Sequence, residues 1–225
     1  MALDERLFNA FRRRVPLFQS VPDRVLRRLS AAAHSREYAQ GETICRPGDP
    51  ARHLWILLSG RVGISRCTWK GARVGLELML PGDAFGLPAV LSGAYPNEIE
   101  ATRDSVVAAL PKPDVMAAIE RCPELARDIL LAFGKRMQFM ESQLVLSRED
   151  AERRVIAALL YLCDRFGEKL PVTRAELGEM AGTTTETSIR VVQRLCAKGL
   201  LKKTPGALVC DQDGMTAVMC GSPAR

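Results

Sequence analysis

Histidine is scarce in this sequence, and its cysteines are scattered. The 225 residues contain two histidines, His34 and His53, and seven cysteines. The sequence has no Cys-x-x-Cys pair, so neither a zinc site nor a dithiol redox site is encoded locally. We therefore expect most cysteines to be buried free thiols that pack as small hydrophobic side chains.

Long apolar runs and common enzyme motifs are also missing. No stretch approaches the roughly 20 apolar residues that cross a bilayer, and residues 1–6 lack the apolar core of a signal peptide. These absences predict a cytoplasmic protein with no membrane partner. There is no Gly-x-Ser-x-Gly elbow, phosphate-loop lysine motif or His-x-His pair, so we expect neither enzymatic activity nor a metal site. A metal-dependent jelly-roll enzyme is the alternative from another functional class.

The composition that remains is globular and basic. Apolar residues make up 47% of the chain and charged residues 26%, as in ordinary globular domains. The formal net charge of +6 and the isoelectric point near 9.1 favour a polyanionic partner. The length leaves room for two modest domains.

Residues 171–203 carry two helix signatures separated by a Gly-Thr turn. Thr173 and Glu176 predict a capping box at the start of the first helix, and Gly182 follows it, where a helix end favours positive φ. The apolar face of this helix is formed by Leu177, Met180 and Ala181. Thr183 and Glu186 predict a second capping box directly afterwards.

The second helix has two contrasting faces. Its inward face is predicted to be Ser188, Val191, Val192 and Leu195. Its outward face comprises Thr184, Thr185, Glu186, Ile189, Arg190 and Gln193. Two helices joined by a tight turn, with a polar outer face on the second, predict a helix-turn-helix that binds double-stranded DNA.

That outer face has the chemistry of base reading. Arg190 can donate to O6 and N7 of guanine, and Glu186 can accept from the amino group of cytosine. Thr173 and Arg174, at the start of the first helix, are placed to contact phosphate. The alternative is that Glu186 and Arg190, four residues apart, form an ordinary ion pair on a solvated helix.

A basic run and a predicted wing follow the second helix. Between Thr187 and Cys210 no residue is acidic and five are basic, a balance that suits phosphate neutralisation: Arg190, Arg194, Lys198, Lys202 and Lys203. Residues 199–209 predict two short strands around Pro205-Gly206, the wing of a winged helix. Lys202, on the first of these strands, is a further candidate for a phosphate contact.

The first half of the chain changes from helix to strand patterning. Apolar spacing predicts helices over residues 3–14 and 21–33. From Arg36 to Pro111, short apolar segments alternate with glycines, which predicts a β-sandwich or jelly roll. The expected strands include residues 43–45, 54–58, 61–65, 74–80 and 106–110.

A long helix is predicted after the strands. Pro123 opens it, and a helix of about 24 residues spans about 36 Å. An apolar stripe runs along it through Ala126, Ile129, Phe133, Met137, Met140 and Leu144. We expect this stripe to be a homodimer seam shared in part with the β-roll, and packing within its own domain is the alternative.

The predicted fold class is α+β with three parts. Residues 1–113 form amino-terminal helices and a β-roll, and residues 114–147 form a short helix and the long dimerisation helix. Residues 148–225 form a winged helix-turn-helix domain, which opens with a helix over residues 151–166.

This order of elements resembles the CRP/FNR family of bacterial transcription regulators, over nearly the whole chain. The most specific marks are segment Thr173–Leu201 and three motifs of the roll, Gly41-Glu42-x-Ile44-x-x-x-Gly48-Asp49, Leu57-x-x-Gly60-x-Val62 and Pro81-Gly82-Asp83-x-Phe85-Gly86. The resemblance implies a cyclic-nucleotide-binding-domain-like roll, a homodimer and contact with RNA polymerase. Glu186 and Arg190 match the family's Glu and Arg of the recognition helix, which implies a near-palindromic site with TGA-type half-sites. Ile189 stands where relatives carry a small or polar residue that helps to select the outermost bases.

The same resemblance places an effector pocket in the roll at Phe85, Gly86, Leu87, Asn97 and Glu98. Cyclic-nucleotide binders of the family have Glu, Arg and Ser at the positions of Leu87, Asn97 and Glu98. A carboxylate would then face the phosphate without a cation, so we expect cyclic AMP not to bind. The iron–sulphur members of the family have clustered cysteines before the roll. Residues 1–44 contain no cysteine, so we expect no iron–sulphur cluster.

The expectation is therefore a regulator with no cofactor, controlled by a signal at the β-roll. Two alternatives of the same fold stay open. One is haem ligation, for which the histidines His34 and His53 and the roll residues Cys45 and Cys67 are available, and the other is a cysteine-based redox switch. An interaction scaffold with a vestigial winged helix is the remaining alternative.

Overall fold

The structure, a computed structural model, describes residues 2–71 and 73–220. The chain divides into two compact units. Unit 1 comprises Met1–Arg66 and Glu77–Met137, and unit 2 comprises Cys67–Leu76 and Gln138–Arg225. The boundary expected after residue 113 falls in the first turn of the helix Lys112–Arg121, and the boundary expected after residue 147 follows the end of the long helix Pro123–Leu146. The two units instead divide within that long helix.

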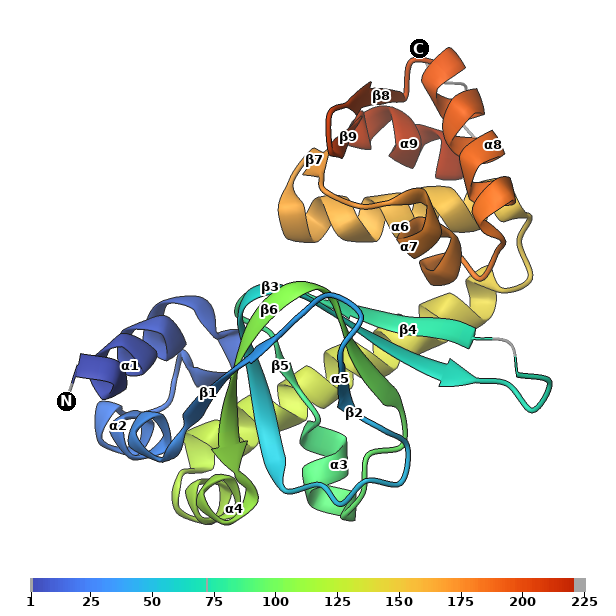
Figure 1. The fold of residues 1–225 in the computed structure, drawn as a ribbon. Coiled ribbons are helices and arrows are strands. Elements are labelled where there is room, and N and C mark those ends of the chain that lie inside the picture. Colours follow the sequence, from blue (N-terminus) through green and yellow to red (C-terminus); the bar gives the residue numbers. More distant parts are fainter. Residues whose placement is uncertain (1, 72, 221–225) are drawn as a thin grey trace. The chain divides into compact units, whose positions relative to one another are not determined.

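Unit 1 begins with helices where apolar spacing predicted them (Figure 1). They are α1 (Ala2–Arg14), the 3₁₀ turn η1 (Pro16–Phe18) and α2 (Asp23–Ala32). The guanidinium of Arg12 closes this corner: it donates to the carbonyl oxygens of Phe18 and Gln19 at 3.0 Å and of Val21 at 2.6 Å. It also pairs with Asp23. One charged donor thus fixes the turn between the two helices.

The β-roll, most of which belongs to unit 1, is a six-stranded sheet. Its strands are β1 (His34–Tyr38), β2 (Thr43–Cys45), β3 (His53–Cys67), β4 (Arg73–Met79), β5 (Ala84–Phe85) and β6 (Glu98–Pro111). β6 pairs antiparallel with β1, β2 and β3, and β3 also pairs with β4 and β5. The α+β class and the predicted β-roll are confirmed.

β3 is longer than the sequence pattern suggested. The segments 54–58 and 61–65, expected to be two strands, lie in one strand, because pairing with β6 continues through Gly60 with register shifts on either side. Gly60 adopts φ +88°, and a Cβ there would lie 2.2 Å from the carbonyl oxygen of Asp104. Glycine therefore lets the strand bend without interrupting the sheet.

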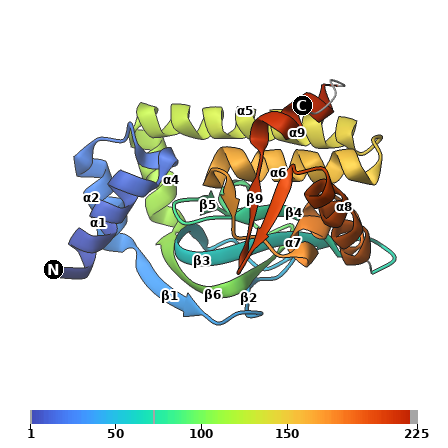
Figure 2. The same ribbon diagram turned by 90° about the horizontal axis from the view of Figure 1, so that it is seen from above.

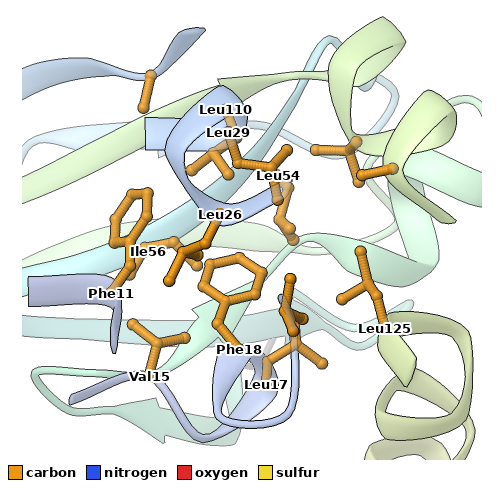
Figure 3. Packing of buried hydrophobic residues seen from close by; sticks show 14 of the residues in the cluster. Phe11, Val15, Leu17, Phe18, Leu26, Leu29, Leu54, Ile56, Leu110 and Leu125 are labelled. Atoms are coloured by element: carbon orange, nitrogen blue, oxygen red, sulfur yellow. The ribbon is translucent and has the colours of Figure 1, made fainter. Parts of the chain in front are cut away.

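One hydrophobic core joins the amino-terminal helices to the sheet (Figure 3). Side chains from several elements meet there, including Phe11 of α1, Leu26 of α2, Ile56 of β3 and Leu125 of α5 (Pro123–Leu146). The rings of Phe11 and Phe18 tilt against each other with centroids 5.5 Å apart. Burying each such side chain contributes about 1.5–3 kcal/mol, so this cluster holds the helices on the sheet.

Three further helices follow the strands of unit 1 or lie between them. They are α3 (Leu87–Ser92), α4 (Lys112–Arg121) and α5, which has 24 residues and begins at Pro123 as predicted. Proline suits this first turn because its missing N–H has no helical partner there. Figure 2 shows α1, α2 and α4 next to one another near the start of α5.

Unit 2 contains a winged helix-turn-helix. Its elements after α5 are α6 (Ala151–Phe166), β7 (Lys169–Leu170), α7 (Arg174–Met180), α8 (Thr185–Ala197), β8 (Leu201–Thr204), β9 (Ala207–Cys210) and α9 (Gln212–Met219). β9 lies between β7 and β8 in an antiparallel sheet. Asp150 caps α6, since its carboxylate accepts from the amide of Arg153 at 2.9 Å.

Replacing Gly60 by Ala tests the bend in β3. Gly41 has a similar φ of +84°, but a Cβ there would meet nothing within 4 Å. Gly41→Ala should therefore cost only the left-handed penalty of about 1–2 kcal/mol. Gly60→Ala adds a backbone clash and should cost about 1–3 kcal/mol more. Urea unfolding followed by the fluorescence of the buried Trp55 measures both, and equal losses would contradict a steric role for Gly60.

Candidate nucleic-acid interface

The capping box predicted from the sequence positions α7. The hydroxyl of Thr173 accepts from the amide of Glu176 at 3.2 Å, and the carboxylate of Glu176 accepts from the amide of Thr173 at 2.7 Å. Gly182 adopts φ +58° just after the helix. A Cβ at Gly178 would lie 3.2 Å from the carbonyl oxygen of Thr184, so glycine allows the turn to pack closely on α7.

α8 begins one residue later than predicted. Thr184 is its N-cap, because its hydroxyl accepts from the amide of Thr187 at 3.1 Å. The expected capping box between Thr183 and Glu186 is therefore wrong. The amide of Thr183 donates instead to the carbonyl oxygen of Gly178 at 2.8 Å. Consecutive threonines fit the same sequence pattern, and the turn decides which of them caps the helix.

The two faces of α8 separate as the spacing predicted. The four inward side chains are buried, namely Ser188, Val191, Val192 and Leu195. The six outward side chains are exposed, namely Thr184, Thr185, Glu186, Ile189, Arg190 and Gln193. Ile189, 39% exposed, adds an apolar side chain to this polar surface.

Arg190 contacts a hydroxyl rather than a carboxylate. Its guanidinium donates to Oγ1 of Thr187 at 3.3 Å. Across residues 2–71 and 73–220, no ion pair joins Arg190 to Glu186, so the structure does not form the helical ion pair considered as the alternative. A guanidinium with one neutral acceptor retains donors for a ligand.

Glu152 of α6 binds two cations of the basic run. Its carboxylate accepts from Nζ of Lys198 at 2.7 Å and from the guanidinium of Arg194 at 2.5 Å. The hydrogen bond from Lys198, assisted by that from Arg194, lowers the pKa of Glu152. Arg194 and Lys198 thus hold α8 on α6, a contact that the sequence pattern did not predict. The remaining cations of the run are Arg190, Lys202 and Lys203.

β8 and β9 form the predicted wing around Pro205-Gly206. Leu201 pairs with Cys210 and Thr204 with Ala207. The side chain of Lys202 on β8 is exposed. At the start of α7, Thr173 is exposed and Arg174 is half-buried. Unit 2 therefore contains all the residues predicted to contact DNA.

The apolar stripe on α5 divides into a buried and an exposed part. Ile129 is 6% exposed and belongs to the core of unit 1, against which Phe133 also packs. Ile129 is therefore not available to a partner, while Ala126 is half-buried. Leu130, outside the predicted stripe, is 70% exposed. The exposed members of the predicted stripe are Met137 at 63%, Met140 at 59% and Leu144 at 70%.

Aromatic rings fill the space beside two residues of the predicted effector pocket. Phe85 stacks on Trp55 with ring centroids 6.4 Å apart. Nε1 of Trp55 donates to the hydroxyl of Tyr95 at 2.9 Å, and that hydroxyl donates to the carbonyl oxygen of His53 at 2.5 Å. A Cβ at Gly86 would lie 3.0 Å from the ring of Tyr95. The hydrogen-bonded pair Trp55–Tyr95 thus limits the room at this point of the roll.

The other three predicted pocket residues differ in their surroundings. Leu87 is buried in the hydrophobic core, while Asn97 and Glu98 are half-buried on or beside β6. Nε of Arg66 donates to the amide oxygen of Asn97 at 2.9 Å. The guanidinium of Arg66 thus lies beside Asn97, the position at which the family's cyclic-nucleotide binders have Arg. Arg66 is 31 residues from Asn97 along the chain, and no local motif points to it.

Burial shifts the pKa values of two candidate sensory residues, His53 and Cys45. Among the described residues, no group of three or more His, Cys, Asp or Glu side chains is placed to hold a metal ion. Burial lowers the pKa of His53 and raises the pKa of the Cys45 thiol to about 11. A thiol with so high a pKa is protonated near neutral pH and reacts slowly with oxidants.

Comparison with known proteins matches both parts of the chain. Residues 35–122 match the cyclic nucleotide-binding domain family, and residues 153–218 match the Crp-like helix-turn-helix domain family. The Cyclic AMP receptor protein of Thermus thermophilus is 31% identical over 196 residues, which are 86% of this chain and 91% of that protein. The chain belongs to the CRP/FNR family of transcription regulators. It is a DNA-binding regulator of that family, built on a winged helix-turn-helix.

Other CRP/FNR proteins are similar over most of the chain. The Fumarate and nitrate reduction regulatory protein of Escherichia coli K12 is 26% identical over 191 residues, covering 81% of this chain and 76% of that protein. The crystal structure of the Thermus thermophilus Catabolite Activator Protein is 29% identical with a TM-score of 0.53, covering 92% and 99% of the two chains. FixK2 from Bradyrhizobium japonicum shares the fold, with 24% identity, a TM-score of 0.75, and coverage of 82% and 96%. The relatives of this chain are regulators rather than enzymes. No described helix has the length and hydropathy of a membrane span.

Replacing Glu152 by Gln tests the contact between α6 and α8. The pKa of Glu152 lies below its ordinary value of 4.5 in the folded chain. Its stabilising effect is therefore complete above that ordinary value and is lost as the pH falls through the lowered one. Because Arg194 and Lys198 are half-exposed, Glu152→Gln should lower the free energy of unfolding by about 1 kcal/mol at neutral pH.

Urea unfolding at neutral and acidic pH measures this effect. The difference between the parent chain and Glu152→Gln should disappear on acidification. Glu149→Gln is the matched control, because Glu149 forms an exposed pair with Arg153 at 3.2 Å and its loss should cost only about 0.3–0.5 kcal/mol. A difference that persists at acidic pH would contradict the role of the ionised carboxylate.

Proposed function

We propose that two copies of this regulator bind a near-palindromic DNA site with TGA-type half-sites and thereby control transcription. The surface of α8 carries the proposal, because its polar side chains are exposed while its apolar side chains pack inside unit 2. In a dimer, two such helices would enter successive major grooves about 34 Å apart.

Arg190 and Glu186 are the base-reading side chains in this proposal. A guanidinium can donate twice to guanine, and a carboxylate can accept from the amino group of cytosine. Thr184, Thr185 and Gln193 add neutral polar groups to the same face, and the apolar Ile189 suits a thymine methyl group. The mixture favours sequence-specific recognition over purely electrostatic binding.

Phosphate contacts would position α8 in the groove. Thr173 and Arg174 stand at the first turn of α7, where backbone amides and the helix dipole favour an anion. Lys202 extends from the wing strand β8. These contacts would set the affinity and its salt dependence, and the side chains of α8 would set the preference for sequence.

The exposed stripe of α5 supports a homodimer. Leu130, Met137 and Leu144 are spaced by seven residues, and Phe133 and Met140 repeat the same interval. Alternating spacings of three and four are those of a two-stranded coiled coil. Large apolar side chains more than half exposed on one helix are otherwise unfavourable in water.

A signal at the β-roll would control this dimer by favouring one of two pre-existing arrangements, and contacts with RNA polymerase would then change transcription. The buried Leu87 and the Trp55–Tyr95 pair favour an effector other than cyclic AMP. Leu87 offers no polar group at the position where cyclic-nucleotide binders of the family have Glu.

Replacing Arg190 by Ala tests base reading. The substitution should weaken binding to a TGA-containing palindrome by about 1–3 kcal/mol and relax the preference at one guanine. Lys202→Ala is the comparison, since it should weaken all sequences alike and reduce the salt slope by about one. Fluorescence anisotropy with specific and scrambled duplexes at several salt concentrations measures both. Unchanged discrimination in Arg190→Ala would contradict base reading.

Replacing Met140 by Glu tests the dimer. Met140 is exposed in the single chain, so the substitution should leave the fold intact but place two carboxylates in the seam and dissociate the dimer. Ser142→Glu adds the same charge two residues away, outside the heptad stripe, and should leave the dimer intact. Analytical ultracentrifugation gives the mass of each variant. A monomeric parent chain, or an intact Met140→Glu dimer, would contradict this interface.

A further inference from the structure

A cavity of about 340 Å³ lies between α2 and α4 in unit 1. The two helices are neighbours near the start of α5 (Figure 2). Arg24 and Arg28 of α2 and Arg121 of α4 line the cavity. No strand of the β-roll contributes to its walls, so this cavity is separate from the effector pocket discussed above.

The three arginines are exposed and line the same cavity, an arrangement that favours the binding of an anion. Arg24 and Arg28 are four residues apart on one face of α2, where like charges repel. Within the described chain, none of the three forms an ion pair with a carboxylate. Arg27 on the same helix is different, because it pairs with Glu5 at 3.0 Å and lies 4.1 Å above the ring of Phe8.

The charge of the walls suits a phosphate group. Three guanidinium groups and the carboxylate of Asp114 give the cavity a net charge of about +2. A phosphate monoester carries about −1.5 to −2 at neutral pH. Guanidinium forks bind phosphate oxygens in pairs, and two helices present them from different sides of the cavity.

The floor of the cavity is apolar and belongs to the protein core. Leu29 and Ala118 line it and are also members of the hydrophobic cluster of unit 1. Its volume is near the lower limit of the range for small-molecule pockets, about 300–1000 Å³. An occupant can therefore place an apolar or planar group on the floor while the arginines hold its anionic end.

We propose that this cavity binds a small phosphate monoester that carries a compact apolar or planar group. The limited volume and the apolar floor select a free metabolite over a lipid headgroup, whose acyl chains would have to leave through the charged walls. The site does not depend on the DNA-binding surface, because every residue that lines it lies in unit 1.

Calorimetric titration of the full chain at constant ionic strength tests the proposal, with phenyl phosphate, inorganic phosphate and phenol as probes. Phenyl phosphate should bind once per chain, inorganic phosphate more weakly, and phenol not at all. Arg24→Gln or Arg28→Gln should weaken phenyl phosphate binding about 10- to 100-fold. Arg13→Gln is the matched control, because it removes the same charge from an exposed position on α1 and should leave the affinity unchanged.

A second variant keeps every charge and removes the space. Ala117 lines the cavity and is half-buried, so Ala117→Leu should fill part of it without unfolding α4. This variant should lose the preference for phenyl phosphate over inorganic phosphate. Equal weakening by Arg13→Gln, or binding that survives the combined Arg24→Gln and Arg28→Gln change, overturns the proposal. Sedimentation with phosphatidic acid vesicles in the absence of phenyl phosphate binding also overturns it, in favour of a lipid headgroup.

Discussion

The packing of α8 on α6 and α7 is the constraint on which the rest of unit 2 depends. An α-helix repeats every 3.6 residues, so burial of Val191, Val192 and Leu195 fixes the rotation of α8 about its axis. Glu152 fixes the same rotation a second time through Arg194 and Lys198. The outward direction of the recognition face therefore follows from contacts on the opposite side of the helix.

The elements that could be predicted from the sequence depend on interactions between residues close in the chain. The capping box of Thr173 and Glu176, the helix start at Pro123 and the positive φ of Gly182 each involve partners within four residues. The helical period likewise predicted the buried and exposed faces of α8, because residues three or four apart in the sequence lie on the same face of a helix. The candidate DNA-binding surface of α8 is mostly of this kind, which is why its exposed positions could be predicted from the sequence.

The features that the sequence did not predict depend on a partner distant in the chain. Glu152 lies 42 residues from Arg194, and pairing with β6 decides that Gly60 bends a strand instead of ending it. Ile129 fits an apolar stripe at helical spacing, but packing with the amino-terminal helices places it in the core. Arg66 reaches Asn97 only because the strand bearing it pairs beside that segment. Spacing along one element cannot distinguish a residue that faces its own domain from one that faces a partner.

The hydrophobic cluster of unit 1 gives the two candidate ligand sites a common neighbour. Leu87 of α3 follows Phe85 in the predicted effector pocket, and Leu29 and Ala118 form the floor of the arginine-lined cavity. Leu87, Leu29 and Ala118 all belong to the cluster that also buries Leu125 at the start of α5. Close-packed interiors have few voids and change between discrete arrangements. A ligand that moves α3 or separates α2 from α4 would therefore act on the same cluster that buries Leu125. Leu125 lies on the helix whose later turns expose the apolar heptad stripe. In the proposed dimer, α5 would therefore be the element that links either ligand to the dimer interface.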